Sequence, residues 1–154
     1  MYKPYKTVSI IMSVFNEEKT IQEVLTQLFS IAYINEIIIV DNGSTDNSKQ
    51  LIEKSMLKDD RIKLLTIENN KGLGKAINLA IQNTTCDIVV RQDADLEYDP
   101  NELINLVEII DKGIAEVVYG SRMLVRKAHK VHYYYSYLAN IIISTFSNLL
   151  TNLF

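Results

Sequence analysis

The chain has 154 residues, which is enough for one domain with a substantial buried core. Its apolar content of 47% and charged content of 23% exclude a disordered chain, and a net charge of −3 gives no reason to expect nucleic-acid binding. A single cysteine, Cys86, excludes an internal disulfide and fits a reducing, cytoplasmic compartment. The polar start, residues 1–6, predicts that no signal peptide is present.

Buried strands and amphipathic helices are expected to alternate along most of the chain. Five mostly apolar, β-branched segments predict strands at Thr7–Val14, Glu36–Val40, Ile62–Ile67, Ile88–Gln92 and Glu116–Tyr119. Apolar residues at helical spacing predict helices at Thr20–Ile31, Asn47–Met56, Lys75–Gln82 and Pro100–Lys112. This alternation, at about 25 to 30 residues a unit, is typical of βαβ units. It predicts an α/β fold with an open, mostly parallel sheet and helices on both faces.

The residues with chemical character follow the ends of the predicted strands. In open α/β sheets, the ligand site lies beyond the carboxyl ends of the strands. The residues expected there are Asn16 and Glu17 after the first strand, Asp41 after the second, Asp93 and Asp95 after the fourth, and Arg122 after the fifth. Their common location favours a functional site over a set of unrelated surface residues.

The acidic stretch after the fourth strand is the most informative part of this set. Asp93, Asp95 and Glu97 share one face if the chain stays extended, and three neighbouring carboxylates repel one another unless a cation lies among them. Mg²⁺ and Mn²⁺ favour such oxygen ligands, often with substrate phosphates. The alternative is a solvated acidic turn that leads into a helix start at Asp99 and Pro100.

Other residues of the predicted site each have two interpretations. Asp41 can accept a hydrogen bond from a ribose hydroxyl or a base N–H, or it can cap the helix that follows. Gly72, Gly74 and Lys75 indicate a loop where the backbone approaches a ligand and Lys75 reaches a phosphate. Arg122 can clamp a phosphate or be a surface charge. The glycine spacing matches neither a dinucleotide fingerprint nor a Walker sequence.

Taken together, five segments resemble successive motifs of the family 2 glycosyltransferases with the GT-A (Rossmann-like) fold. They are VSIIMSVFNEEKTI, IIIVDNGSTDNS, NNKGLGKAINLAI, VVRQDADLEYDP and VVYGSR. The resemblance runs from residue 7 to residue 154 and is strongest to the polyprenyl-phosphate (dolichol-phosphate-like) hexosyltransferases. The ordered set carries the resemblance, since an Asp-x-Asp sequence alone is common.

The resemblance implies inverting, metal-dependent transfer of a hexose from a nucleotide-diphosphate sugar, of the UDP-glucose or GDP-mannose type, to a polyprenyl phosphate. It implies that the nucleotide sugar contacts Val14, Asn16, Glu17, Asp41, Gly43, Gly74, Lys75 and Asp93. It also implies that Asp93, Asp95 and Glu97 hold Mg²⁺ or Mn²⁺, and that Arg122 acts with Asp93 and Asp95 in catalysis by meeting a phosphate. Glu97 stands where some members of the family have glutamine.

The C-terminal segment, residues 132–154, is predicted as a separate apolar helix after a nucleotide-sugar-binding domain at residues 1–131. It is rich in Tyr, Ile, Leu and Phe and follows a basic loop at residues 126–130, a combination typical of a membrane interface. We therefore expect a peripheral protein on the cytoplasmic face of the membrane. The alternative is a helix packed on its own domain or on a partner. The sequence leaves the oligomeric state open.

Two further functions remain open from the sequence, and a third is disfavoured. In the resembled group, a Leu-Thr-Asp motif and more acceptor-side structure follow the segment that matches residues 151–154, so the resemblance implies that this chain is truncated, with weak or no transfer activity. It could instead act on a glycan or protein acceptor, or bind nucleotide sugars without transfer. A nucleotidyltransferase would usually have a Gly-rich, basic loop after the first strand, where this chain has residues 15–18 (FNEE).

Overall fold

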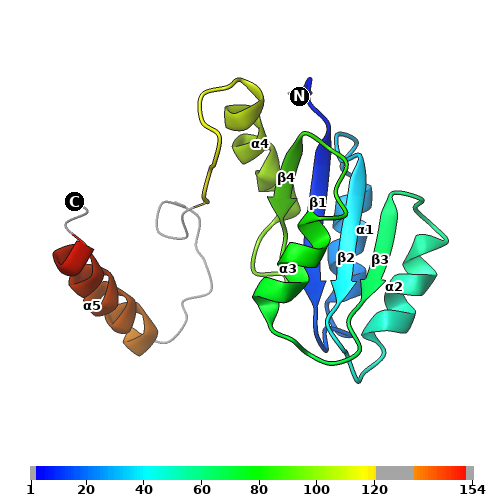
Figure 1. Cartoon of the computed structure of the whole chain (residues 1–154), viewed down its shortest axis with the longest axis horizontal. Coiled ribbons are helices and arrows are strands. Elements are labelled where there is room, and N and C mark those ends of the chain that lie inside the picture. The colour runs from blue at the N-terminus through cyan, green and yellow to red at the C-terminus, as the bar shows by residue number, and fades with distance from the viewer. Residues whose placement is uncertain (1–2, 121–133, 152–154) are drawn as a thin grey trace. The chain divides into compact units, whose positions relative to one another are not determined.

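The structure is a computed structural model that describes residues 3–120 and 134–151. The chain divides into two units, residues 1–120 and residues 121–154. The elements, in chain order, are β1 (Val8–Val14), α1 (Ile21–Phe29), β2 (Glu36–Asp41), α2 (Ser48–Met56), β3 (Ile62–Thr66), α3 (Leu73–Ile81), β4 (Ile88–Arg91), a 3₁₀ turn (Pro100–Glu102), α4 (Leu103–Asp111) and α5 (Tyr134–Thr151) (Figure 1).

The first unit is built on a four-stranded sheet in the order β3-β2-β1-β4, and every neighbouring pair is parallel. The two central strands, β1 and β2, are buried along almost their whole length. Their apolar residues do not alternate with polar ones, because helices cover both faces of a parallel sheet. The predicted α/β fold with a mostly parallel sheet is therefore confirmed.

Two apolar layers hold helices against the two faces of this sheet. On one face, side chains of α1, α2 and α4 pack on alternate residues of the central strands, including Ile10, Met12 and Ile39. On the other face, Ala76 and Ala80 of α3 pack on the intervening strand residues. Figure 1 shows α3 and α1 on opposite sides of the sheet. The small alanine side chains let α3 lie close to the strands.

The predicted helices form, with differences at their ends. Helix α3 begins at Leu73, two residues earlier than expected, so that Gly74 and Lys75 lie in its first turn and not in a loop. The turn before it is made by Gly72, whose φ of 84° is unfavourable for other residues. Gly113 follows α4 and ends the helical segment with a φ of 69°, and its N–H donates to the carbonyl of Ile110.

The prediction of a fifth strand at Glu116–Tyr119 is wrong for this structure. These residues form neither strand nor helix, and Val117 and Tyr119 are 65% and 89% exposed. Within the described part of the chain, β4 pairs with β1 and with no other strand. A β-rich sequence becomes a strand only where a neighbouring strand and a packing surface are available, and here this segment pairs with none of the described strands.

The described part of the second unit is the single helix α5, 18 residues long. Its exposed large apolar side chains are Leu138, Ile141, Ile142, Ile143, Phe146, Leu149 and Leu150. None of the described helices combines the length and apolarity needed to span a bilayer. The helix predicted from residue 132 onward is thus present, from residue 134.

Candidate functional site

The strand order places the candidate site at the carboxyl ends of β1 and β4. The chain runs from β1 outward to β2 and β3, and then returns to the other side of β1 to form β4. Such a reversal leaves a crevice between the two strands that diverge, which is where open α/β sheets bind ligands. Val14 of β1 pairs with Asp41 of β2, and Ile11 pairs with Arg91 of β4, so the predicted site residues collect at one edge.

The loop after β1 is tied to the loop after β2 through Asn16. Its side-chain Oδ1 accepts hydrogen bonds from the backbone N–H and the hydroxyl of Thr45, at 2.8 and 3.3 Å. Its own N–H donates to the Ser44 hydroxyl at 3.1 Å. A φ of 59° at Asn16 makes this arrangement feasible, because asparagine tolerates the left-handed region better than most residues. The amide of Asn16 therefore holds two loops together in this structure.

The acidic residues that follow extend this connection. The Glu17 N–H donates to the Ser48 hydroxyl at 2.8 Å, and the Glu17 carboxylate accepts from Thr20 at 3.0 Å. The carboxylate of Glu18 accepts from both the backbone and the side-chain amide of Asn47. Burial by itself would raise the pKa of the neighbouring Asp46, but hydrogen bonds from Ser48 and from the Glu18 N–H hold that pKa below its usual value.

Asp41 lies at the end of β2 and is almost completely buried, with 2% of its surface exposed. Its Oδ1 accepts the Ser44 N–H at 3.2 Å, so it closes the turn that begins the second loop. Val14, its partner in the sheet, is fully buried in the core, and its carbonyl accepts the Asn42 N–H. These two predicted nucleotide-binding residues therefore lie at the carboxyl ends of β1 and β2, beneath the loops that follow these strands.

The loop between β3 and α3 is fastened to the same edge by Asn42, which is 3% exposed. Its side-chain amide donates to Asn70 Oδ1 at 3.1 Å, and its Oδ1 accepts the Lys71 N–H at 3.1 Å. Asn70 Oδ1 also accepts the Gly72 N–H at 2.9 Å. Gly43 lies against this loop, since a Cβ on it would be 2.8 Å from the Asn70 nitrogen. The three loops that follow β1, β2 and β3 thus form one connected rim.

The acidic stretch after β4 is extended only through Asp93, and the chain bends from Ala94 onward. Asp93 is half-buried and accepts two hydrogen bonds from the Arg91 guanidinium, the shorter at 2.7 Å. Asp95 is exposed and its Oδ1 accepts the Glu97 N–H at 3.0 Å, while Leu96 has a φ of 63°. The chain therefore turns at Leu96, and Glu97 no longer continues the alternation that the sequence predicts for an extended strand.

The structure does not gather all three of these carboxylates into one ligand set. Over residues 3–120 and 134–151, no three Asp, Glu, His or Cys side chains are gathered as a ligand set. However, Mg²⁺ and Mn²⁺ are usually held by one or two carboxylates together with substrate phosphates. Asp93 and Asp95 supply that number at the ligand-binding edge of the sheet. The roles predicted for Asp93, Asp95 and Glu97 in binding metal remain predictions.

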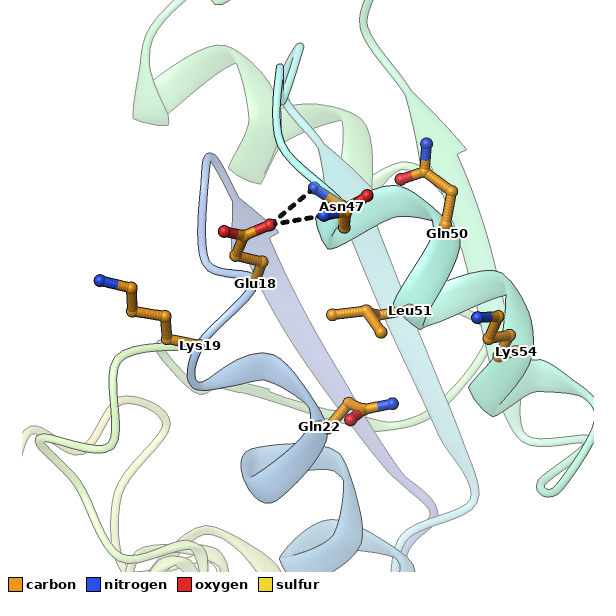
Figure 2. Close-up of a pocket in the computed structure, with 7 residues that line it drawn as sticks. All are labelled: Glu18, Lys19, Gln22, Asn47, Gln50, Leu51 and Lys54. Carbon is orange, nitrogen blue, oxygen red and sulfur yellow. Dashed lines mark hydrogen bonds between the residues drawn. The ribbon is translucent and has the colours of Figure 1, made fainter.

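Two surface pockets flank the rim without including its aspartates. Figure 2 shows the first, between the N-terminal part of α1 and one side of α2, where Glu18 contacts Asn47. Its lining residues are Glu18, Lys19, Gln22, Asn47, Gln50, Leu51 and Lys54. The second lies along β3 and α3 and includes Lys71 and Lys75. The Lys75 side chain therefore lines a pocket at the side of α3. A Cβ added to Gly74 would meet no atom within 4 Å, so no neighbouring segment packs against this glycine.

The remaining predicted residue, Arg122, lies outside the described residues, as does the basic loop at residues 126–130. Conversely, three contributors were not predicted from the sequence: Arg91, which pairs with Asp93; Asn42, which joins two loops; and Gln92, which is buried beside Asp93. Of these three residues, only Gln92 could have been noticed in the sequence. It places an amide on the side of β4 that otherwise carries apolar residues.

Comparison with known protein families gives a match over almost the whole chain. The model described as "Glycosyl transferase family 2" matches residues 9–149. A curated relative from Pseudomonas fluorescens (strain SBW25), an undecaprenyl-phosphate 4-deoxy-4-formamido-L-arabinose transferase, is 37% identical over 113 residues. That alignment covers 69% of this chain and 33% of the relative, so the chain spans about a third of the relative's length.

Solved structures of similar fold include three proteins in complex with a nucleotide or a nucleotide sugar. A mannosyltransferase from Pyrobaculum calidifontis, in complex with GDP-Man and Mn²⁺, is 25% identical with a TM-score of 0.60. The matched region covers 72% of this chain and 32% of the mannosyltransferase chain. TarS 1-349 from S. aureus, in complex with UDP, is 30% identical with a TM-score of 0.60, and the match covers 69% of this chain and 32% of the TarS chain. Glucosyl-3-phosphoglycerate synthase from Mycobacterium tuberculosis, with Mn²⁺ and UDP, is 26% identical with a TM-score of 0.55 and covers 69% and 40%.

Proposed function

Since the chain belongs to glycosyl transferase family 2, we propose that it binds a nucleotide-diphosphate sugar and serves the transfer of that sugar to a polyprenyl phosphate. The observation that carries the proposal is the position of Asp93 and Asp95. They follow β4 directly, beside β1, at the reversal in strand order where open α/β sheets bind ligands. The proposal does not specify the sugar, and the donor nucleotide can be either UDP or GDP.

In this proposal, the rim formed by the loops after β1, β2 and β3 receives the nucleoside. Asp41 at the base of the rim accepts a hydrogen bond from the base or the ribose through the carboxylate oxygen that Ser44 does not use. The turns at Gly43 and Gly72 bring backbone to the ligand without obstruction by side chains. Asn16 and Glu17 contribute mainly through the loops that they hold in place.

Asp93 and Asp95 are proposed to hold Mg²⁺ or Mn²⁺ against the diphosphate. A cation bound there would act as a Lewis acid that stabilises the charge of the departing nucleoside diphosphate. In this structure Arg91 neutralises part of the charge on Asp93, at a side-chain exposure of 47% for the arginine. An ion pair this exposed is weak, so Asp93 can release Arg91 and bind a cation instead.

The acceptor chemistry fits the residues that this chain offers. The oxygen of a polyprenyl phosphate is already anionic, so its attack on the anomeric carbon needs little help from a general base. Displacement in a single step inverts that carbon and requires no nucleophilic side chain. Two anionic substrates repel each other, and Arg122 is proposed to reduce that repulsion by contacting a phosphate.

We also propose that the protein works on the cytoplasmic face of a membrane, because a polyprenyl phosphate is a membrane lipid. The exposed apolar side chains of α5 support this, since such a helix can lie in the interface plane. Cosedimentation of the chain with anionic vesicles tests it. Replacing Ile143 and Phe146 by Asn should release the protein from the vesicles, and equal sedimentation of this variant would contradict the proposal.

Calorimetric titration of UDP and of GDP, each with and without Mn²⁺, tests the donor site. We expect Mn²⁺ to strengthen the binding of one nucleotide at least about ten-fold, and Asp95→Asn to remove most of that gain. Glu23→Gln, an exposed residue of α1, is the matched control because it removes the same charge away from the site. A wild-type chain whose affinity for both nucleotides is unaffected by Mn²⁺ would contradict the metal site.

A transfer assay then separates the acceptors. In an incubation of the donor with polyprenyl phosphate, with oligosaccharides and with protein, any product is expected from the lipid phosphate alone, and the weak activity implied by the family resemblance predicts a low yield. Product from an oligosaccharide or a protein would favour the alternative acceptor. Mn²⁺-dependent binding without product from any acceptor would favour a nucleotide-sugar-binding module.

A further inference from the structure

Gln92 occupies a position in the fold that its neighbours make unusual for an amide. It is 1% exposed and follows β4 directly, between Val90 and Ala94, which belong to the apolar layer under α1 and α4. Along an extended segment, alternate residues share a face, so Val90, Gln92 and Ala94 point to the core side and Asp93 to the other. The pattern calls for an aliphatic residue at position 92, and the sequence has glutamine there.

The contacts of this amide indicate what it does. Its Nε2 donates to the carbonyl of Asp93 at 3.1 Å and to the carbonyl of Tyr98 at 3.2 Å. The Gln92 backbone N–H donates to the carbonyl of Ile11 in β1 at 3.1 Å. One residue therefore joins the beginning and the end of the acidic stretch to each other and to the central strand of the sheet.

The same side chain carries an energetic cost. Its Oε1 is buried and has no hydrogen-bond partner among the residues that the structure describes. An acceptor left unsatisfied in the interior destabilises a fold, and native proteins contain few of them. An apolar side chain of similar size would avoid this cost, so the donor group at Nε2 is what distinguishes glutamine here.

We propose that Gln92 is a positioning residue that fixes Asp93 and Asp95 in the arrangement that receives a divalent cation and a nucleoside diphosphate. It acts through the backbone of the acidic stretch and does not contact the ligand. Because the chain between the two carbonyls turns at Leu96 with a positive φ, it needs an external restraint to hold one conformation. The inference rests on the proposed function, since it concerns the same site.

A merely structural role for Gln92 makes a different prediction. In that case, loss of the amide would lower the stability of the domain and would weaken nucleotide binding equally with and without Mn²⁺. A positioning role acts on the metal-dependent part of the affinity alone. Residues that orient metal ligands from behind typically change metal affinity about 10- to 100-fold when they are replaced.

The test uses the full chain and its Gln92→Met variant, which keeps the length of the side chain and removes the donor. UDP and GDP are titrated with and without Mn²⁺ by calorimetry, and thermal unfolding is measured alongside. Gln92→Met should weaken the Mn²⁺-dependent binding about ten-fold or more and leave the metal-free affinity unchanged. Ser55→Ala is the matched control, because it removes a buried hydrogen bond to a backbone carbonyl within α2, away from the acidic stretch.

The outcomes separate this inference from the proposed function. If the wild-type chain shows no Mn²⁺-dependent binding, both are overturned. If the wild type binds with Mn²⁺ and Gln92→Met binds equally well, only the role of Gln92 is overturned. If Gln92→Met fails to fold, Gln92→Leu, which also lacks the donor and introduces no buried charge, replaces it in the same titrations. Failure of both variants to fold would show that Gln92 serves folding and would overturn the inference.

Discussion

Replacement of Gly43 by alanine should disrupt the rim that joins the loops after β2 and β3. Gly43 has a φ of 82°, and a residue with a Cβ pays about 1–2 kcal/mol to adopt a left-handed conformation. A Cβ at this position would also lie 2.8 Å from the Asn70 nitrogen and 3.0 Å from the Asn69 carbonyl carbon, whereas ordinary van der Waals contact begins at 3.4 Å. Both neighbours are backbone atoms, so relief requires a movement of the loop.

Gly113 provides the matched comparison for this prediction. It has a similar φ of 69°, and a Cβ added there would meet no atom within 4 Å. Gly113→Ala should therefore cost only the conformational part, about 1–2 kcal/mol, while Gly43→Ala should cost about 2–4 kcal/mol because the clash is added. The difference between the two variants measures the contact between the loops and not the conformational preference of glycine.

Urea unfolding followed by circular dichroism gives both free energies of unfolding. Nucleotide titration provides a second measurement, since a displaced Asn70 no longer accepts hydrogen bonds from the Asn42 amide and the Gly72 N–H. We expect weaker nucleotide binding for Gly43→Ala and wild-type binding for Gly113→Ala. If the two variants lose the same stability and bind nucleotide alike, the close packing of Gly43 on the loop after β3 has no energetic importance.

Two further predictions concern the opposite end of the sheet, where the Arg61 guanidinium donates to the carbonyls of Phe29, Ile31 and Ile34. Arg61→Ala leaves these carbonyls without their donor and should lower the free energy of unfolding by about 2–3 kcal/mol. Lys63→Ala, which removes the same charge from an exposed side chain, should lower it by about 0.5 kcal/mol or less. Equal losses for the two variants would contradict a stabilising role for the Arg61 hydrogen bonds. Hydrogen bonds from the Arg61 side chain hold the pKa of Asp59 below its usual value, so this carboxylate stabilises the fold at neutral pH and the stabilisation is lost as the pH falls below about 4. The difference in stability between the wild type and Arg61→Ala should narrow from pH 7 to pH 3, and a constant difference would contradict this linkage.

Several features of this protein could be predicted from the sequence because they depend on local order. The apolar runs and their spacing indicated four of the strands and the helices between them, and the alternation indicated a parallel sheet covered on both faces. The same order placed Asp41, Asp93 and Asp95 at one edge, since the carboxyl ends of parallel strands lie together. These conclusions require only periodicity and the direction of the chain.

The fifth predicted strand shows where local order is insufficient. Residues 116–119 have the composition of a strand, but strand formation depends on a partner that composition does not specify. The length of the extended acidic stretch is a similar case. Spacing alone placed Glu97 beside Asp93 and Asp95, whereas the hydrogen bond from the Glu97 N–H to Asp95 turns the chain before it.

Only the tertiary structure decided what each polar side chain at the edge contacts. Asn16 meets Thr45, and Asn42 meets Asn70, across separations of 29 and 28 residues that no local pattern reports. The burial of Gln92 likewise depends on the helices packed over β4. The sequence by itself determined the fold class and the family resemblance, and it predicted the edge at which the site is proposed to lie, because these follow from periodicity and motif order. Folding determined which of these residues hold the loops and which remain for a ligand, because hydrogen-bond partners are chosen by proximity in space.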